Sequence, residues 1–276
     1  MIHLHTALFG ISLGLVSQVI AECSRATLQE VTAAYVRAQA AGQPGLLNLA
    51  SNVSYAENDT PMDIKTGVIS QTITIDFSRS LHDTVECAAF TEITAATSPH
   101  PYVIHTRMLV AAADGRVTAI ESVVTDEGDW VFNATGHLYW TQQENWNPIP
   151  ADQRDSRETI QAAADAYLDQ WADSTLPVPL GTSCARLEGG MYTGERNASA
   201  NTCRMPSFPT PILAGNRRYV IDEALGAVDV FNGFPWLERT LPPEEAVPSS
   251  NMVRVERGLI RYVHEITVCV TARCGR

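Results

Sequence analysis

The sequence of 276 residues predicts an α+β fold in which one module of helix and strands occurs twice. Residues 24–29 (SRATLQ) return as 156–161 (SRETIQ), at an offset of 132 residues. An amphipathic helix pattern opens each copy, and alternating strand patterns follow it. Two copies indicate a duplicated domain, because a solenoid needs about three or more units to bury its faces. Further echoes relate 55–58 to 186–189, 79–83 to 218–222, and 115–123 to 258–266.

In the first copy we expect a helix that begins at Ser24, a residue type that caps helix N-termini, and ends before Gly42 and Pro44. A second short helix is expected around residues 46–49. The dipeptide Asp114-Gly115 is typical of a hairpin turn between two strands. The strands expected in the first copy are 70–90, 102–111 and 116–125.

The second copy repeats this order. A helix is expected over 156–171, with Tyr167 and Trp171 in its inward stripe, and prolines at 177 and 179 end it. Segments rich in Pro, Ser and Thr predict irregular loops at 197–215 and 242–250. The strands expected here are 183–188, 219–231, 252–256 and 259–270.

The insertion between the copies, 126–155, is rich in aromatic residues. Disordered linkers are poor in such residues, so we expect this connector to pack across the seam between the two halves. Its tryptophans fit a packed core better than a platform for substrate. The predicted organisation is a signal peptide (1–21), a first domain (22–125), the connector (126–155) and a second domain (156–276).

Three features predict a protein of the secretory pathway. The apolar run 7–16 is too short to span a bilayer, and small residues follow it before a cleavage point after Ala21. Six cysteines, an even number, are typical of disulfides in an oxidising compartment, and keeping bonds within each copy favours Cys23–Cys87. Four sequons for N-glycosylation begin at Asn52, Asn58, Asn133 and Asn197. The other cysteines, Cys184, Cys203, Cys269 and Cys274, leave several pairings open.

Charge excludes several classes of partner. The formal net charge is −12, and Lys65 is the only lysine. A nucleic-acid backbone needs a basic stripe, and an anionic membrane surface repels an acidic chain. We therefore expect neither nucleic-acid binding nor a membrane span in the mature chain.

No familiar cofactor or metal motif is present. The sequence contains no phosphate-cradling glycine loop, HExxH helix or dinucleotide fingerprint, and the single lysine argues against Schiff-base chemistry. A GxSxG string at 10–14 falls within the expected signal peptide. We expect no cofactor and no metal site, because the histidines of the mature chain are scattered. They are His82, His100, His105, His137 and His264.

The element order, with Tyr55 and Glu57 on the first strand and the Gly115 hairpin near the end, resembles the nuclear-transport-factor-2-like (NTF2-like, SnoaL-like) fold. This resemblance implies helices folded over a strongly curved antiparallel sheet, which leaves a cone with a pocket at its open end. A closer resemblance is to a family of secreted fungal proteins, most without an assigned activity. The segments that carry it are 129–134 (DWVFNA), 184–190 (CARLEGG), 216–222 (NRRYVID) and 263–269 (VHEITVC).

The chain and that family also resemble the hetero-Diels–Alderases of tropolone–sesquiterpene pathways, which join a tropolone quinone methide to a humulene-type alkene. The resemblance implies a cyclase that acts on an apolar small molecule by dehydration and [4+2] closure. It transfers no residue role. Two alternatives are a secreted protein that binds an apolar small molecule without chemistry, and an extracellular interaction protein whose cone is filled by side chains.

Acidic, histidine and tyrosine side chains on the strands are the candidate acid–base groups. Arg186 and Glu188 are two residues apart on a strand and share a face, as an active-site pair or as a structural ion pair. Asp83 and Asp222 recur in both copies, which favours a shared structural role. For His264, the alternative to a place in the pocket is that its side chain faces solvent or the seam. The first-copy candidates are Tyr55, Glu57, His82, Asp83 and His105, with Arg186, Glu188, Tyr192, Asp222 and His264 as their counterparts.

Overall fold

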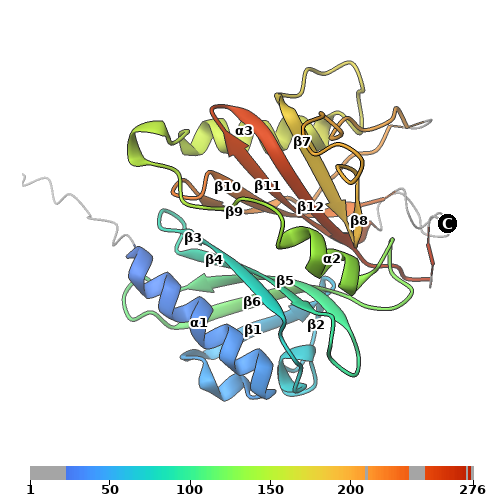
Figure 1. Ribbon diagram of the computed structural model, residues 1–276. Helices are drawn as coiled ribbons and strands as arrows, with labels where there is room; N and C mark the ends of the chain where they lie inside the picture. Colours follow the sequence, from blue (N-terminus) through green and yellow to red (C-terminus); the bar gives the residue numbers. More distant parts are fainter. Residues whose placement is uncertain (1–22, 209–210, 236–245, 272, 275–276) are drawn as a thin grey trace, which may run out of the picture.

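Two six-stranded sheets stack face to face in the computed structural model, which describes residues 23–208, 211–235, 246–271 and 273–274. One helix covers the outer face of each sheet, so the layers run helix, sheet, sheet, helix (Figure 1). The strand order is the same in both sheets, and in each the first and last long strands pair in parallel while the other pairs are antiparallel. The chain is therefore a tandem of two NTF2-like halves, as predicted. The sheets are mixed and not wholly antiparallel as expected, because the last strand of each half returns beside the first strand of that half in the same direction. The expected signal peptide lies outside the described residues.

The first half opens with helix α1 (Arg25–Ala41). The Ser24 side chain accepts a hydrogen bond from the Thr27 backbone N–H, and Gly42 ends the helix with a left-handed φ of 64°. The sheet order is β2-β1-β6-β5-β4-β3. Its strands are β1 (Leu49–Glu57), β2 (Thr60–Pro61), β3 (Phe77–Asp83), β4 (Ala88–Ala95), β5 (Tyr102–Val110) and β6 (Val117–Thr125), with 3₁₀ turns η1 (Pro44–Leu46) and η2 (Val68–Ser70).

The second half opens with helix α3 (Arg157–Asp169), which Ser156 caps in the same way as Ser24 caps α1. The sheet order is β8-β7-β12-β11-β10-β9. Its strands are β7 (Leu180–Glu188), β8 (Met191–Tyr192), β9 (Arg218–Asp222), β10 (Ala227–Phe234), β11 (Val247–Glu256) and β12 (Leu259–Thr267). The connector between the halves contains α2 (Ala134–Thr141) and η3 (Ala151–Gln153).

Four expectations about local structure are wrong. The segments 70–90 and 219–231 are each broken by a turn, because the carboxylates of Asp83 and Asp222 accept backbone N–H groups two or three residues further on. Residues 247–250, expected in a loop, begin β11 because they are fully buried between β10 and β12. The helix expected at 46–49 is only the short turn η1 followed by β1.

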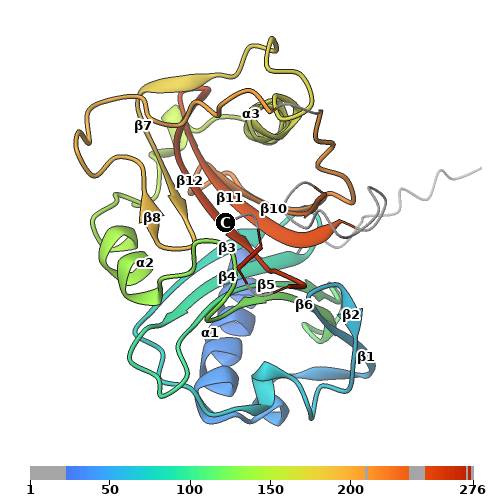
Figure 2. The ribbon, with the colours of Figure 1, turned by 90° about the vertical axis from the view of Figure 1, so that its right-hand side faces the viewer.

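A shared core joins the two sheets. The large side chains of Phe90 and Phe231, which are at most 1% exposed, meet between them with Met252 and Ile266. Two further cores fill the space between α1 and its sheet and between α3 and its sheet. Each strand therefore has one face toward its own helix and one toward the seam. Figure 2 shows α1 and α3 on opposite outer sides, with α2 beside the seam.

Two ion pairs related by the repeat cross the seam. Arg25 on α1 binds Asp222 with both guanidinium nitrogens, at 2.7 and 2.8 Å, and Arg157 on α3 binds Asp83 at the same two distances. Each carboxylate also accepts a backbone N–H from the opposite half. The two arginines lie 132 residues apart, the offset of the repeat, so the pairs form a pseudo-twofold lock. Asp83 and Asp222 therefore occupy structural positions.

The Asp222 end of this lock predicts a loss of stability in acid. Burial acts to raise the pKa of Asp222, but hydrogen bonds from His82 and Arg25 outweigh it and lower the pKa to about 2. This contribution, about 2 kcal/mol, is fully present above the unfolded value of 3.8 and is lost as the pH falls toward 2. Urea unfolding measures the free energy of unfolding at pH 5 and at pH 2. This free energy should fall less between the two pH values for Asp222→Asn than for the wild type, and an equal fall would contradict the assignment.

Three disulfides are present, each within one half: Cys23–Cys87, Cys184–Cys203 and Cys269–Cys274. The first is the pair favoured by the sequence. Cys23–Cys87 joins the start of α1 to the turn between β3 and β4. None of the helices within the described ranges has the length and apolar character needed to cross a bilayer.

Candidate functional site

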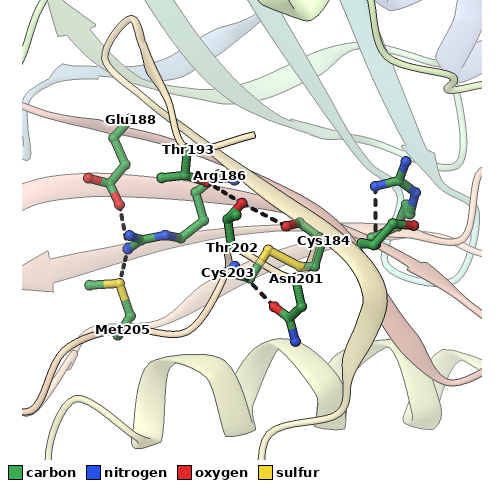
Figure 3. The surroundings of a disulfide bond; sticks show 10 residues. Cys184, Arg186, Glu188, Thr193, Asn201, Thr202, Cys203 and Met205 are labelled. Carbon is green, nitrogen blue, oxygen red and sulfur yellow. Dashed lines mark hydrogen bonds and ion pairs between the residues drawn. A yellow bond between two sulfur atoms is a disulfide. The ribbon is translucent and has the colours of Figure 1, made fainter. Parts of the chain in front are cut away.

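The interior of the second half holds an ion pair between Arg186 and Glu188 on β7. The guanidinium lies 2.6 Å from the carboxylate, and both side chains are nearly buried on the face toward α3. Arg186 also contacts the sulfur of Met205 (Figure 3). The Cys184–Cys203 disulfide ties β7 to the segment that carries Met205, which holds that segment over the pair.

A second carboxyl group, Glu265 on β12, is paired in register with Glu188. Its side chain is buried and accepts a hydrogen bond of 2.9 Å from the Thr267 hydroxyl. Burial, reinforced by the neighbouring charge of Glu188, raises the pKa of Glu265 to about 8. Burial also raises the pKa of Glu188 against the opposing effect of Arg186. Because its pKa lies above 7, Glu265 carries a proton near neutral pH.

Several polar atoms around this pair have no hydrogen-bond partner among the described residues. They include the Tyr167 hydroxyl, the Trp171 indole N–H, the Arg186 Nε and the Asn251 side-chain oxygen. The Arg186 guanidinium lies near the Tyr167 hydroxyl and acts to lower the pKa of that hydroxyl, against the larger effect of burial. A buried polar group without a partner costs about 1–3 kcal/mol, and polar atoms of a bound ligand would offset this cost. We call Tyr167, Trp171, Arg186, Glu188, Asn251 and Glu265 the inner polar set.

The equivalent positions of the first half are closed. Tyr35 is the repeat partner of Tyr167, and its hydroxyl bonds Thr106 at 2.6 Å, which in turn bonds Ser122 at 2.8 Å. Thr106 pairs in register with Ser122 just as Asn251 pairs with Glu265. Thr106 and Ser122 of the first half therefore occupy the positions of Asn251 and Glu265. Small hydroxyl groups stand there in place of an amide and a carboxyl group.

Tyr55 and Glu57, the first-half candidates on β1, also satisfy each other. The Tyr55 hydroxyl donates to the Glu57 carboxylate, which also accepts from the Val68 backbone N–H. Ser122 pairs with Glu57 as Glu265 pairs with Glu188, so the equivalence of the two strands is preserved. Of these equivalent positions, those of the second half therefore keep the polar atoms without hydrogen-bond partners in the part of the chain that the structure describes.

His105 and His264 are not in either cone. Both lie on the seam face of their strands, where they approach the buried carboxylate of Glu92. The expected equivalence of these two histidines is wrong, because His105 is on β5 and His264 is on β12, the counterpart of β6. By strand register the counterpart of His105 is Ser250 on β11.

The remaining candidates lie apart from the inner polar set. His82 on β3 bonds the Thr32 hydroxyl at 3.1 Å and lies 3.7 Å from Asp222, within the pseudo-twofold lock. Tyr192 on β8 stacks on Trp140 of α2, with ring centroids 4.5 Å apart. The expected equivalence of His82 and Tyr192 is also wrong, because β8 corresponds to β2 and not to β3.

Four members of the inner polar set were not among the candidates: Tyr167, Trp171, Asn251 and Glu265. Tyr167 and Trp171 were visible as part of the helix stripe, but such a stripe normally indicates only core packing. Asn251 lay at the edge of an expected loop. Glu265 adjoins His264, and neighbours on a strand point to opposite faces. A site that includes the His264 side chain therefore does not include that of Glu265.

Comparison with known proteins gives little functional information. Residues 153–267, less than half of the chain, match a family described as "Domain of unknown function (DUF8021)". No curated protein matches the sequence significantly. Among solved structures, an NTF2-like protein of unknown function from Shewanella baltica OS155 is similar over 37% of this chain and 94% of its own, with 13% identity and a TM-score of 0.28. The segment matched by the family includes the whole inner polar set.

Proposed function

We propose that the inner polar set binds an oxygen-bearing but mainly apolar small molecule, and that the chain is a biosynthetic cyclase. One observation carries this proposal: a buried carboxyl pair beside an arginine, surrounded by donors that have no partner among the described residues. Apolar side chains around them, including Phe234 and Val263, supply the walls of such a site.

The carboxyl pair and Arg186 suit a dehydration. The protonated member donates its proton to a hydroxymethyl group as the C–O bond breaks, and water leaves. The ionised member takes the proton of the ring hydroxyl, which yields a quinone methide. The overall change is the loss of one water molecule, with no oxidation. Acid–base catalysis of this kind contributes about 10²- to 10⁴-fold in rate.

The quinone methide can then close with an alkene without further chemistry from the protein. One C–C and one C–O bond form in the [4+2] step, and no group leaves. Holding both partners in reacting geometry contributes several kcal/mol, on the order of 7 or more in favourable cases. Donors such as Tyr167 and Arg186 polarise the oxygen-bearing diene. The family resemblance favours a tropolone quinone methide and a humulene-type alkene as the partners.

Incubation of the purified chain with a hydroxymethyl tropolone and humulenol tests this function. We expect cyclised product to form faster than in buffer, as followed by liquid chromatography and mass spectrometry. Native mass spectrometry of the same mixtures separates the alternatives. A tropolone that binds unchanged, with no faster product formation, would make the chain a binding protein. If the tropolone is neither bound nor converted, the proposed site is refuted.

We also propose that the protein is exported and glycosylated. The three disulfides are compatible with an oxidising compartment. Asn52, Asn133 and Asn197 are exposed, whereas the Asn58 side chain is hydrogen-bonded to both backbone groups of Val124. We therefore expect glycans at the three exposed sites and none at Asn58. Peptide mass mapping of protein secreted from a eukaryotic host, with and without glycosidase, checks this. An Asn58 glycan would contradict the expectation.

A further inference from the structure

A second group of buried polar side chains lies between the halves, outside the inner polar set. Glu92 on β4, His105 on β5, His137 on α2 and His264 on β12 are all 0% exposed. We call these four residues the seam cluster. The connector closes it on one side, because α2 contributes His137 and the residues after α2 contribute Glu144.

Three imidazole rings converge on one carboxylate oxygen. His264 Nδ1 lies 2.7 Å from Glu92 Oε1, His137 Nε2 lies 3.5 Å from it, and His105 Nε2 lies 3.6 Å from it. Only the His264 contact is a hydrogen bond. The Nε2 atoms of His105 and His137 have no hydrogen-bond partner among the described residues.

The other nitrogen of each ring is held by an outer residue. Glu144 lies 2.6 Å from His264 Nε2, the Thr94 hydroxyl lies 2.9 Å from His137 Nδ1, and the Ser250 hydroxyl lies 2.8 Å from His105 Nδ1. Histidines that bind a metal usually donate their second N–H to a carboxylate, carbonyl or similar acceptor, which fixes the ring and its tautomer. The outer residues of the seam cluster provide this support for all three rings.

We propose that the seam cluster is a structural zinc site, with Glu92, His137 and His264 as ligands and His105 completing the set. The ligand atoms of the first three residues lie within 4.8 Å of one another. Tetrahedral Zn²⁺ binds such nitrogen and oxygen atoms at about 2.0–2.2 Å, which places neighbouring ligand atoms about 3.3–3.5 Å apart. His105 and His137 already lie near this spacing from Glu92, and the His264 ring moves slightly away from Glu92 to admit the ion. Imidazole with carboxylate suits a divalent transition metal, and a closed set of four protein ligands is typical of structural zinc.

A hydrogen-bonded network without metal explains the contacts of His264 but not those of its neighbours. It leaves two buried imidazole nitrogens unpaired, at a cost of about 1–3 kcal/mol each. A metal ion coordinates both. It also joins β4 of the first half, β12 of the second half and the connector, which are the three parts of the chain that meet at the seam.

Metal analysis of the full chain, produced with its disulfides formed, tests the site. We expect about one zinc per chain by plasma mass spectrometry, as one closed site requires. Removal with a chelator should lower the melting temperature, and Co²⁺ should restore it with the visible absorption of tetrahedral cobalt. A folded chain that binds neither Zn²⁺ nor Co²⁺ in excess overturns the proposal. These readouts do not depend on turnover.

Three variants sharpen the test. His137→Gln should abolish binding, and Glu144→Gln, which changes only an outer residue, should weaken it about 10- to 100-fold. His100→Ala is the control, because His100 is exposed and contacts only Asp126 among the described ion pairs. If His137→Gln does not fold, the affinity of Glu144→Gln decides. Unchanged zinc affinity in Glu144→Gln, or an equal loss in His100→Ala, overturns the assignment.

Discussion

The Glu188→Gln variant should lose about 10²- to 10⁴-fold in the rate of product formation, because the amide cannot exchange the proton that the carboxyl pair holds. Gln has nearly the same size as Glu, and its oxygen can still contact Arg186, so the fold should be retained. The substrate should still bind, since the Tyr167 hydroxyl on α3 and the Trp171 indole N–H just after it remain. Single-turnover kinetics with the tropolone substrate, alongside its dissociation constant by native mass spectrometry, separates the two effects.

Glu57→Gln is the matched control. Glu57 occupies the equivalent position of the first half, but Tyr55 and the Val68 backbone already satisfy its carboxylate. We expect its turnover to match the wild type. Equal losses in both variants would indicate a general structural effect, and full activity of Glu188→Gln would exclude the carboxyl pair. Loss of affinity alone in Glu188→Gln would favour a binding protein.

Much of the fold could be predicted because a duplication is recorded in local patterns. The helix caps Ser24 and Ser156 and the hairpin residues Gly115 and Gly258, both with positive φ, recur in order. The echo of 79–83 in 218–222 corresponds to strands β3 and β9. The repeat could not show where these strands end. The turns that end them depend on backbone N–H groups that donate hydrogen bonds to the Asp83 and Asp222 carboxylates.

The site was harder to predict because it depends on faces and on distant contacts. Neighbouring residues on a strand point to opposite faces, so an error of one residue in assigning faces confuses His264 with Glu265. His264 faces the seam, whereas Glu265 faces the interior of the second half. Arg186 and Glu188 were found because two-residue spacing fixes a shared face. Whether such a pair is closed or open depends on residues far away in the sequence, such as Asn251. The seam cluster likewise gathers side chains from four separate elements, which no local pattern reports.

Removal of one carboxylate of the pseudo-twofold lock should cause a large loss of stability. Asp83→Ala should lower the free energy of unfolding by about 3–5 kcal/mol, as expected when one partner of a buried ion pair is removed. The Asp83 carboxylate is 0% exposed and accepts from the Arg157 guanidinium and from the backbone of Val85, Glu86 and Ile221. All of these donors lose their acceptor together. Urea unfolding at pH 7 measures the loss.

A cycle of variants separates the ion pair from the turn that Asp83 also closes. Arg157→Ala should cost less than Asp83→Ala, because Asp83 then keeps its backbone donors and Arg157 made only the seam contact. The double variant should cost less than the sum of the two single variants, since the two residues form one interaction. Asp114→Ala is the control: Asp114 accepts the Arg116 backbone N–H in a turn and binds the Arg116 side chain, but the pair is exposed, so its loss of stability should be well below that of Asp83→Ala. If Asp83→Ala behaves like Asp114→Ala, then the two halves are held together by their shared apolar core alone.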